Sequence, residues 1–197
     1  TRRREPIDAG LSRAFRVALL LARGRSTVGP LEETSLPFRV WPTDIDILMH
    51  MNNGRYLTLM DLGRADATIR NGIRKALDQR NWYPVVASET IRFRESLPLF
   101  ERFELRTRTL GWDEKSFYLR QLFLVRGRVT AIGIVRIRFL KRSGGTLSAT
   151  EVAHAILPNT VSPKLPAYIA AWRDAESGYS HATSIESSKN HRTSLGV

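Results

Sequence analysis

Residues 44–57 read DIDILMHMNNGRYL, and this stretch leads directly into a long segment with helical spacing. The apolar run begins near Tyr56, so Asn52 or Asn53 is the expected N-cap of the helix. Backbone N–H groups in the first turn of a helix have no internal partner and lie at the positive end of its dipole. The motif therefore predicts a helix start that can stabilise a carbonyl oxygen as it gains negative charge.

The segment that follows has the pattern of a buried helix. Apolar residues recur at steps of three and four from Leu59 to Ala76, and a second row of apolar and small residues runs from Tyr56 to Ala67. The two rows cover a wide arc, so we expect other structure to surround this helix. The Asn-Gly pair at residues 71–72 predicts its end, or a break before a short continuation.

Four strand-like segments come next, without another convincing helix between them. They lie near residues 88–96, 100–112, 115–125 and 129–140. The sequence RGR, residues 126–128, predicts the turn between the last two. With a short extended piece at residues 38–42, the order is strand, buried helix, then antiparallel strands, which predicts an α+β architecture. A βαβ fold is disfavoured because the later strands lack crossover helices.

Composition shifts divide the chain into four parts. A basic amphipathic segment and a linker rich in turn-forming residues come first, and a compact domain follows. A helical extension then contains two short helices, one capped by Thr146 or Ser148 and one begun by Pro166. A polar, serine-rich tail is expected to be disordered. The expected boundaries are 1–37, 38–140, 141–176 and 177–197.

The formal charge of +12 is the largest anomaly of the composition. The excess is +3 in residues 1–37, +7 in 38–140 and +2 in 141–197, so it does not form a basic tail. Such a field favours polyanionic partners, and a solvated arginine-rich surface is the alternative. The chain has no recognisable RNP, KH, zinc-finger or helix-turn-helix signature, so we expect no specific nucleic acid partner.

The sequence contains no cysteine, which excludes disulfides, thiolate metal sites and a cysteine nucleophile. No apolar run reaches the roughly 18–20 residues that cross a bilayer. Residues 11–25, LSRAFRVALLLARGR, predict an amphipathic helix that docks on its own protein, or else a weak contact with a membrane surface. We expect a cytoplasmic location, with peripheral attachment to a membrane as the alternative.

Three chemical roles can be assigned to the opening stretch. Asp44, Asp46 and His50 are possible metal ligands, but a 2-His-1-carboxylate site needs a second histidine nearby, and no HExxH spacing occurs. We therefore expect neither a metal nor another cofactor. Asp46 could instead act at the helix start as a general base or as a nucleophile. In the structural alternative, both carboxylates only cap the turn and balance arginines. Spacing alone leaves the second and third roles open.

The stretch DIDILMHMNNGRYLTLMDLGR, residues 44–64, resembles the signature of the hotdog-fold thioesterase superfamily, typified by 4-hydroxybenzoyl-CoA thioesterase. In that signature a D-x-D precedes a G/H-x-x-N-x-x-Y stretch that enters the central helix. Residues 93–139 are similar to the thioesterase superfamily member 6 subgroup. The resemblance covers residues 38–140 and implies an antiparallel sheet wrapped around one long central helix. It also implies a homodimer or homotetramer that forms through the sheets.

The resemblance also implies roles for residues of the motif. Asp46 matches the catalytic carboxylate, and Asn53 matches the position whose backbone N–H faces the thioester carbonyl. His50 matches a position near the acyl pocket, where it could bond Asp46 or the substrate or could simply be a packed loop residue. The spacings between His50 and the two aspartates, six and four, differ from the five of the related hydratases, which argues against a hydratase.

A second group of residues is expected to bind the substrate. Asn52 and Tyr56 match positions near the acyl pocket, and Met60 could line an acyl tunnel, although aromatic and Met side chains on a helix are more often core. Asp61 is a reserve candidate, because some hotdog thioesterases use a carboxylate on the helix. Four arginines of the predicted strands and of the RGR turn could hold the phosphates of CoA. They are Arg92, Arg94, Arg126 and Arg128.

Together these expectations predict that the protein is a thioester hydrolase that acts on acyl-CoA or on an acyl-carrier thioester. In this hypothesis CoA is part of the substrate and no separate cofactor is needed. The missing glycine in ILMH, where several family members have one after the aspartate, departs from the pattern. A non-catalytic acyl-CoA-binding or regulatory protein on the same fold is the alternative.

Overall fold

The computed structural model describes residues 7–8 and 27–178, and it divides the chain into two units, Thr1–Pro163 and Lys164–Val197. In the second unit, residues 167–178 are helical. The elements of the first unit are β1 (Ile7–Asp8), β2 (Thr34–Arg39), the 3₁₀ helix η1 (Pro42–Asp44), α2 (Asn53–Arg70), α3 (Ile73–Asp78), β3 (Trp82–Phe93), β4 (Arg102–Trp112), β5 (Phe117–Val125), β6 (Arg128–Lys141), β7 (Thr146–Leu147) and α4 (Ala149–Ile156).

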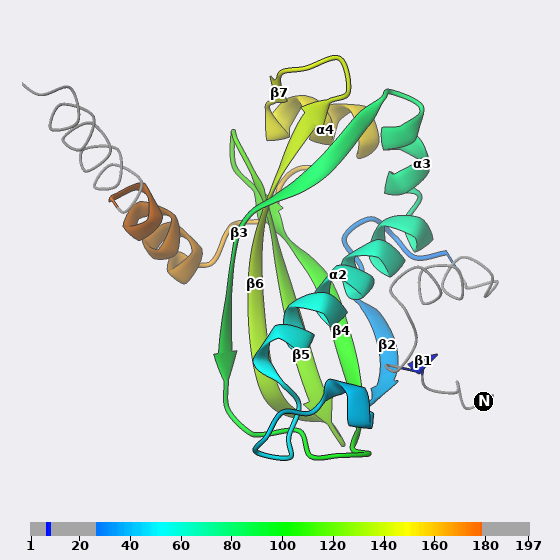
Figure 1. The fold of residues 1–197 in the computed structure, drawn as a ribbon. Coiled ribbons are helices and arrows are strands. Elements are labelled where there is room, and N and C mark those ends of the chain that lie inside the picture. The colour runs from blue at the N-terminus through cyan, green and yellow to red at the C-terminus, as the bar shows by residue number, and fades with distance from the viewer. Residues whose placement is uncertain (1–6, 9–26, 179–197) are drawn as a thin grey trace, which may run out of the picture. The chain divides into compact units, whose positions relative to one another are not determined.

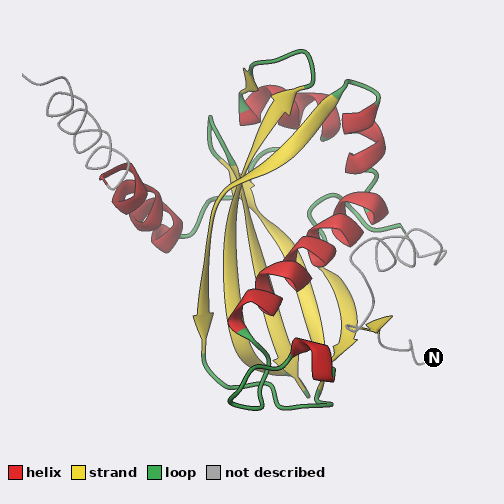
Figure 2. Ribbon diagram, in the orientation of Figure 1, coloured by secondary structure: helices red, strands yellow, loops and turns green. Residues whose placement is uncertain are grey.

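One sheet curves around the helix α2 (Figures 1 and 2). The strand order is β1-β2-β4-β5-β6-β3, and β7 pairs with β6. Every pair is antiparallel except β1 with β2. The meander β4-β5-β6 joins neighbours through short turns, and β3 reaches the far edge because α2 and α3 carry the chain across the concave face. This is the α+β hotdog architecture that the resemblance implied.

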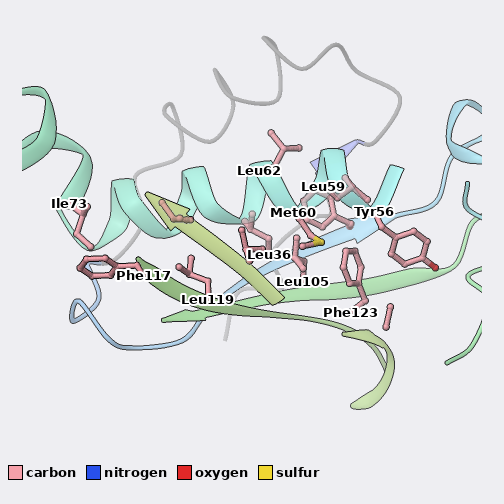
Figure 3. Packing of buried hydrophobic residues seen from close by; sticks show 14 of the residues in the cluster. Leu36, Tyr56, Leu59, Met60, Leu62, Ile73, Leu105, Phe117, Leu119 and Phe123 are labelled. Atoms are coloured by element: carbon pink, nitrogen blue, oxygen red, sulfur yellow. The ribbon is translucent and has the colours of Figure 1, made fainter. Parts of the chain in front are cut away.

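The core lies between α2 and the concave face of the sheet (Figure 3). Leu59 and Met60 of α2 are fully buried, as is Phe123 of β5. Two glycines allow helix and sheet to approach closely. A Cβ on Gly63 would lie 2.7 Å from Thr107 Oγ1, and one on Gly133 would lie 2.6 Å from Met60 Cε. Interiors are close-packed, so neither position has room for a side chain unless its neighbours move.

Strand β2 begins at Thr34, four residues before the predicted start of the domain. Thr34, Leu36 and Phe38 are buried in alternation, which is the period of a strand with one face on the core. The turn-forming composition up to residue 37 predicted a linker, but Pro37 is part of the strand. In the described residues β1 pairs only with Phe38 and Arg39, so Pro37 lies where the outer edge of β2 is unpaired and a proline is tolerated.

The expected boundary at residue 140 is also wrong, although the helix predicted after it is confirmed. Ser148 caps α4, and its Oγ accepts a 3.0 Å bond from the Glu151 N–H. Val152 and Ala153 are buried in the common core, so α4 completes the first unit. The second predicted helix extends to at least residue 178, beyond the expected start of the tail. Residues 11–25 and 179–197, which carry the other terminal predictions, lie outside the described residues.

The ends of α2 confirm the sequence signals. Asn52 is the N-cap, and its Oδ1 accepts a 2.8 Å bond from Gly54 N–H. The helix ends at Arg70, and Gly72 has a φ of 76° before α3 begins. A non-glycine side chain is strained in that conformation, which explains why the break falls at the Asn-Gly pair.

Candidate active site

The first carboxylate of the opening stretch belongs to the framework of the loop. Asp44 is fully buried, and its Oδ1 lies 2.6 Å from Nη2 of Arg55 on the first turn of α2. Its Oδ2 accepts from the Trp41 N–H, and its carbonyl accepts from the Asn52 N–H at 2.8 Å. Both carboxylate oxygens are therefore occupied, and Asp44 ties the 3₁₀ turn to the start of the helix. The structural interpretation is confirmed for this residue.

The second carboxylate opens a tight turn that ends at His50. The N–H of Met49 bonds the Asp46 carbonyl at 3.0 Å, and the N–H of Asp46 bonds the His50 carbonyl at 3.0 Å. Met49 has a φ of 61°, a left-handed conformation that closes the turn. This geometry brings the side chains of Asp46 and His50 to the same side. The three residues between them, Ile47, Leu48 and Met49, are exposed.

The side chains of Asp46 and His50 are neighbours and both reach solvent. His50 Nδ1 lies 3.6 Å from Asp46 Oδ1, which is beyond a direct hydrogen bond. Asp46 Oδ1 accepts from the Leu48 N–H at 2.9 Å, so this oxygen is anchored by its own turn. Within the part of the chain that the structure describes, Oδ2 has no hydrogen-bond partner. It is the oxygen that water or a substrate can approach.

Four of the predicted residues line one pocket of about 170 Å³ beside this turn. Its walls come from the loop, the start of α2 and the end of β3. The lining residues are His50, Met51, Asn53, Tyr56, Phe93, Arg94, Glu95 and Ser96. Asp46 is not among them and reaches this region only through its neighbour His50. Asn52 is the helix cap and does not line the pocket either.

Asn53 is the first residue of α2, and it is exposed where it lines the pocket. The next two N–H groups are taken, since Gly54 bonds the Asn52 side chain and Arg55 bonds the Asn52 carbonyl at 2.9 Å. The Asn53 N–H has no acceptor among residues 7–8 and 27–178. The start of the helix therefore presents one free donor at the positive end of its dipole.

Tyr56 forms the floor of the pocket and is also part of the core. Its ring packs edge-on against those of Phe93 and Phe123, with distances between ring centroids of 4.9 Å and 4.8 Å. Burial raises the pKa of Tyr56 to about 12, so the phenol stays neutral near pH 7 and does not act as a base there. Met60 lies one turn further along α2, fully buried against Gly133, and is not a lining residue. Figure 3 shows it among the core side chains. The structure thus places Met60 in the core.

Asp61 lies in a different pocket, of about 350 Å³, between the second half of α2, α3 and the start of β3. Its Oδ1 pairs with Arg64, a nearly buried residue that also bonds Gln121 at 2.9 Å and lies 3.4 Å from Glu89. Gln121 in turn donates to the Met60 carbonyl and to Thr107. No feature of the sequence pointed to this buried polar network.

The predicted phosphate-binding arginines are separated by strand alternation. Phe93 of β3 faces α2, so Arg92 points to the opposite face of the sheet, and it does not line the pocket. Arg94 follows the end of the strand and does line it. Arg128 pairs with the lining residue Glu95 at 2.9 Å. The RGR turn is confirmed, with left-handed φ angles at residues 126 and 127.

Sequence reasoning missed four pocket residues, which are Met51, Phe93, Glu95 and Ser96. For Phe93 a signal existed, because its alternation with the flanking arginines places it on the helix side of β3. Glu95 and Ser96 follow the strand in a loop whose path no periodicity gives. Among the described residues, no three His, Asp or Glu side chains are grouped so that they could hold a metal ion, and no helix is long and apolar enough to span a bilayer.

The family model of the thioesterase-like superfamily matches residues 40–172, which include the whole loop, α2 and the meander. The chain belongs to the thioesterase-like superfamily. A curated relative, Protein THEM6 of Xenopus laevis, is 46% identical over 94 residues, which are 48% of this chain and 45% of the frog protein. The chain spans about half the length of this frog protein and of Protein THEM6 of Danio rerio, 45% and 57%.

Solved structures of other thioesterases share the fold. The YbaW probable thioesterase of Escherichia coli matches with a TM-score of 0.59 at 20% identity, over 62% of this chain and 95% of that one. The BH1999 gentisyl-coenzyme A thioesterase matches with a TM-score of 0.54 at 20% identity, over 61% and 99%. At such identities the likeness establishes the hotdog fold and leaves the substrate to other arguments.

Proposed function

We propose that this member of the superfamily is a thioester hydrolase that acts on acyl-CoA or on an acyl-carrier thioester. The observation that carries the proposal is the free N–H of Asn53 at the start of the central helix, in a residue that lines the pocket beside Asp46. A donor fixed at this place can stabilise the negative charge that a thioester carbonyl gains when it is attacked.

In the proposed reaction, Asp46 Oδ2 takes a proton from water, and the hydroxide oxygen bonds to the carbonyl carbon. The carbonyl electron pair moves to the oxygen, which the Asn53 N–H binds. When the carbonyl forms again, the C–S bond breaks and the thiolate leaves with a proton. Alternatively Oδ2 attacks the carbon directly, and water then hydrolyses the mixed anhydride. Either path uses Oδ2, the oxygen of Asp46 that has no hydrogen-bond partner in the described residues.

His50 is proposed as a positioning residue in this reaction. It lines the pocket and its Nδ1 lies 3.6 Å from Asp46 Oδ1, so it is the lining residue that borders the carboxylate. Catalytic contacts are often long in unliganded enzymes and shorten when the substrate binds. A shift of a few tenths of an ångström would bring the two side chains into hydrogen-bond range.

CoA suits the charge around the pocket. Arg94 lies in its wall, and a guanidinium binds phosphate oxygens in a bidentate manner. A likeness of fold to a gentisyl-coenzyme A thioesterase supports the same class of thioester. Tyr56 and Phe93 give the pocket an aromatic floor on which an apolar acyl group can rest.

We propose further that the protein is at least a homodimer. β3 is twelve residues long and pairs only with β6 in the described part of the chain, so its outer edge offers a row of backbone groups. Such an edge is a template for another strand. Size-exclusion chromatography with light scattering is expected to give a mass near twice 22.4 kDa, or a larger multiple. A monomer at micromolar concentration would refute this part.

The test is a hydrolysis assay across short, long and aromatic acyl-CoAs and an acyl-carrier thioester, with Asp46→Asn as the inactivated variant. Asp61→Asn is the matched control, because it makes the same change in the other pocket. The parent and Asp61→Asn are expected to release thiol, and Asp46→Asn is not. If Asp61→Asn alone abolishes turnover, the catalytic carboxylate has been assigned to the wrong pocket. If the parent binds acyl-CoA without hydrolysing it, the hypothesis of a non-catalytic acyl-CoA-binding protein replaces that of an enzyme.

A further inference from the structure

The outer face of the sheet, turned away from α2, carries a concentration of arginines. Strand side chains alternate between faces, and on β2 to β6 the residues between the buried positions are repeatedly arginine. We call this surface the outer arginine face. Its arginines are Arg39, Arg92, Arg102, Arg106, Arg108, Arg120, Arg136 and Arg138. Much of the +7 excess in residues 38–140 is therefore gathered on one side of the sheet.

The strand register places some of these charges directly opposite one another. Arg39 of β2 faces Arg102 of β4, and Arg108 of β4 faces Arg120 of β5. Like charges at directly opposed positions of an antiparallel pair destabilise the sheet. The two pairs concentrate positive charge on this face, and Glu33 of the same chain lies 3.3 Å from Arg120 of the second pair.

Acidic residues offset only part of this charge. Glu33 lies within 3.9 Å of Arg106 and 3.3 Å of Arg120, and Glu104 pairs with Arg106. Within the described residues, no ion pair involves Arg102, Arg108 or Arg138. These three guanidinium groups come from two strands, so the unbalanced charge is spread over the face.

The arrangement is two-dimensional. One row across four strands runs Arg106, Leu122, Ile132, Arg92, and the row beside it runs Arg108, Arg120, Ile134, Thr90. In the first row two half-buried aliphatic side chains lie side by side between two arginines. Long arginine stems can lie along such apolar surface while their charged ends stay in water.

We propose that the outer arginine face docks on an anionic phospholipid surface. A leaflet presents phosphates in two dimensions, and guanidinium groups bind phosphate in a bidentate manner. The aliphatic residues between the charges suit the boundary between headgroups and acyl chains. The proposal is independent of turnover, and it concerns residues other than segment 11–25.

Two other occupants fit the face less well. A second copy placed face to face would bring two sets of eight arginines together, which like-charge repulsion opposes. Single-stranded nucleic acid binds on exposed aromatic rings, whereas Tyr118 on this face is buried. Duplex nucleic acid remains as an outcome that the test must separate.

The test is flotation of the full chain with phosphatidylcholine vesicles, with and without phosphatidylserine. The variant is the triple change Arg102→Gln, Arg108→Gln and Arg138→Gln. The matched control removes the same charge from α3, its C-terminal turn and the β4–β5 turn, with Lys75→Gln, Arg80→Gln and Lys115→Gln. Each basic residue near an anionic surface contributes roughly 1 kcal/mol, so the triple variant is expected to partition on the order of a hundredfold less.

The expected results are binding only with phosphatidylserine, a loss with rising salt, and near-parent binding by the control. Hydrolysis of a soluble acyl-CoA and the circular dichroism melting curve should be unchanged in the triple variant. Equal losses in both triple variants would overturn the proposal, because net charge alone would then decide binding. So would equal binding to neutral vesicles, or tighter binding to duplex DNA at the same ionic strength with the same sensitivity to the triple change.

Discussion

Asp44 and Asp46 are two residues apart, yet the fold gives them opposite environments. Asp44 has no exposed surface, and three protein groups satisfy its carboxylate and its carbonyl. Asp46 is about a quarter exposed, has one oxygen held by its own turn, and lies beside a pocket. The difference arises because Asp44 is the last residue of the 3₁₀ helix η1, whereas Asp46 lies in the exposed loop that follows it.

Residue type and spacing therefore do not determine by themselves which of two carboxylates can be reactive. A carboxylate with both oxygens occupied contributes to the stability of the loop, whereas one with a free oxygen can take a proton or attack a carbonyl. The framework side of the motif consists of Asp44, Arg55 and Asn52, and the site side consists of Asp46, His50 and Asn53. Changes on the two sides should therefore differ in which measurement they affect.

The largest effect is expected on the site side. Asp46→Asn should lower kcat/KM for the best thioester by about 10²–10⁴, the usual contribution of a general acid or base. The unfolding free energy should stay within about 0.5 kcal/mol, since the side chain is exposed and its anchor to Leu48 survives in an amide. Steady-state kinetics and urea denaturation check the two halves. An active Asn variant would erase the distinction between the two carboxylates.

The reverse pattern is expected for Asp44→Asn. Removal of one charge leaves the Arg55 guanidinium beside a buried neutral amide, and breaking a buried pair costs about 3 kcal/mol. Urea denaturation measures the loss. Asp78→Asn is the control, because its ion pair with Arg74 is exposed and should be worth less than about 1 kcal/mol. Similar losses in the two variants would show that burial does not distinguish these pairs.

The raised pKa of Tyr56, a residue that lines the pocket, predicts that stability depends on pH. Its pKa is raised to about 12 in the folded state, above the value of 10.0 for an exposed tyrosine. The unfolded chain therefore releases this proton first, and stability present below pH 10 is lost as pH rises toward 12. Tyr56→Phe should remove about 2 kcal/mol of that loss. Urea denaturation at pH 8 and pH 12 measures this loss of unfolding free energy in the variant and in the parent. An equal loss in both proteins would contradict the raised pKa of Tyr56.

The smallest expected effect concerns the cap that joins the two sides. Asn52→Ala removes the acceptor for the Gly54 N–H and should cost about 1 kcal/mol of unfolding free energy, while Asn52→Ser should retain most of it. The Gly54 N–H would then be a second free donor beside that of Asn53, so the donor position is less well defined and kcat/KM should fall modestly. If the Ala variant is as stable as the parent, the cap is not what fixes the helix start.

Much of the fold could be predicted from the sequence. The periodic apolar rows gave α2, the Asn-Gly pair gave its break, and alternation gave the meander with its RGR turn. These signals are local, because they depend on which face of one element is apolar. The boundaries at residues 38 and 140 failed for a non-local reason: β2 and α4 are held by packing against β4 and α3, which composition does not reveal.

The site was predictable in part for the same reason. His50, Asn53, Tyr56 and Arg94 do line one pocket, but three of them belong to one short motif and share a helix start. Met60 was predicted to line an acyl tunnel, and Asp61 was a reserve candidate because some hotdog thioesterases use a carboxylate on the helix. The rotation of the helix turns Met60 into the core and Asp61 toward a second pocket. Residues 53–61 span more than two turns of a helix, so neighbours in sequence point in different directions.

The sequence by itself determined the helix start with its free donor, since caps and dipoles depend only on local chemistry. It also determined the strands and the charge excess. Only the tertiary structure decided that Asp44 is enclosed and Asp46 is accessible, that the end of β3 supplies a wall of the pocket, and that eight arginines share one face. These outcomes depend on strand register and on the packing of distant segments, and a one-residue change of register would have reversed them.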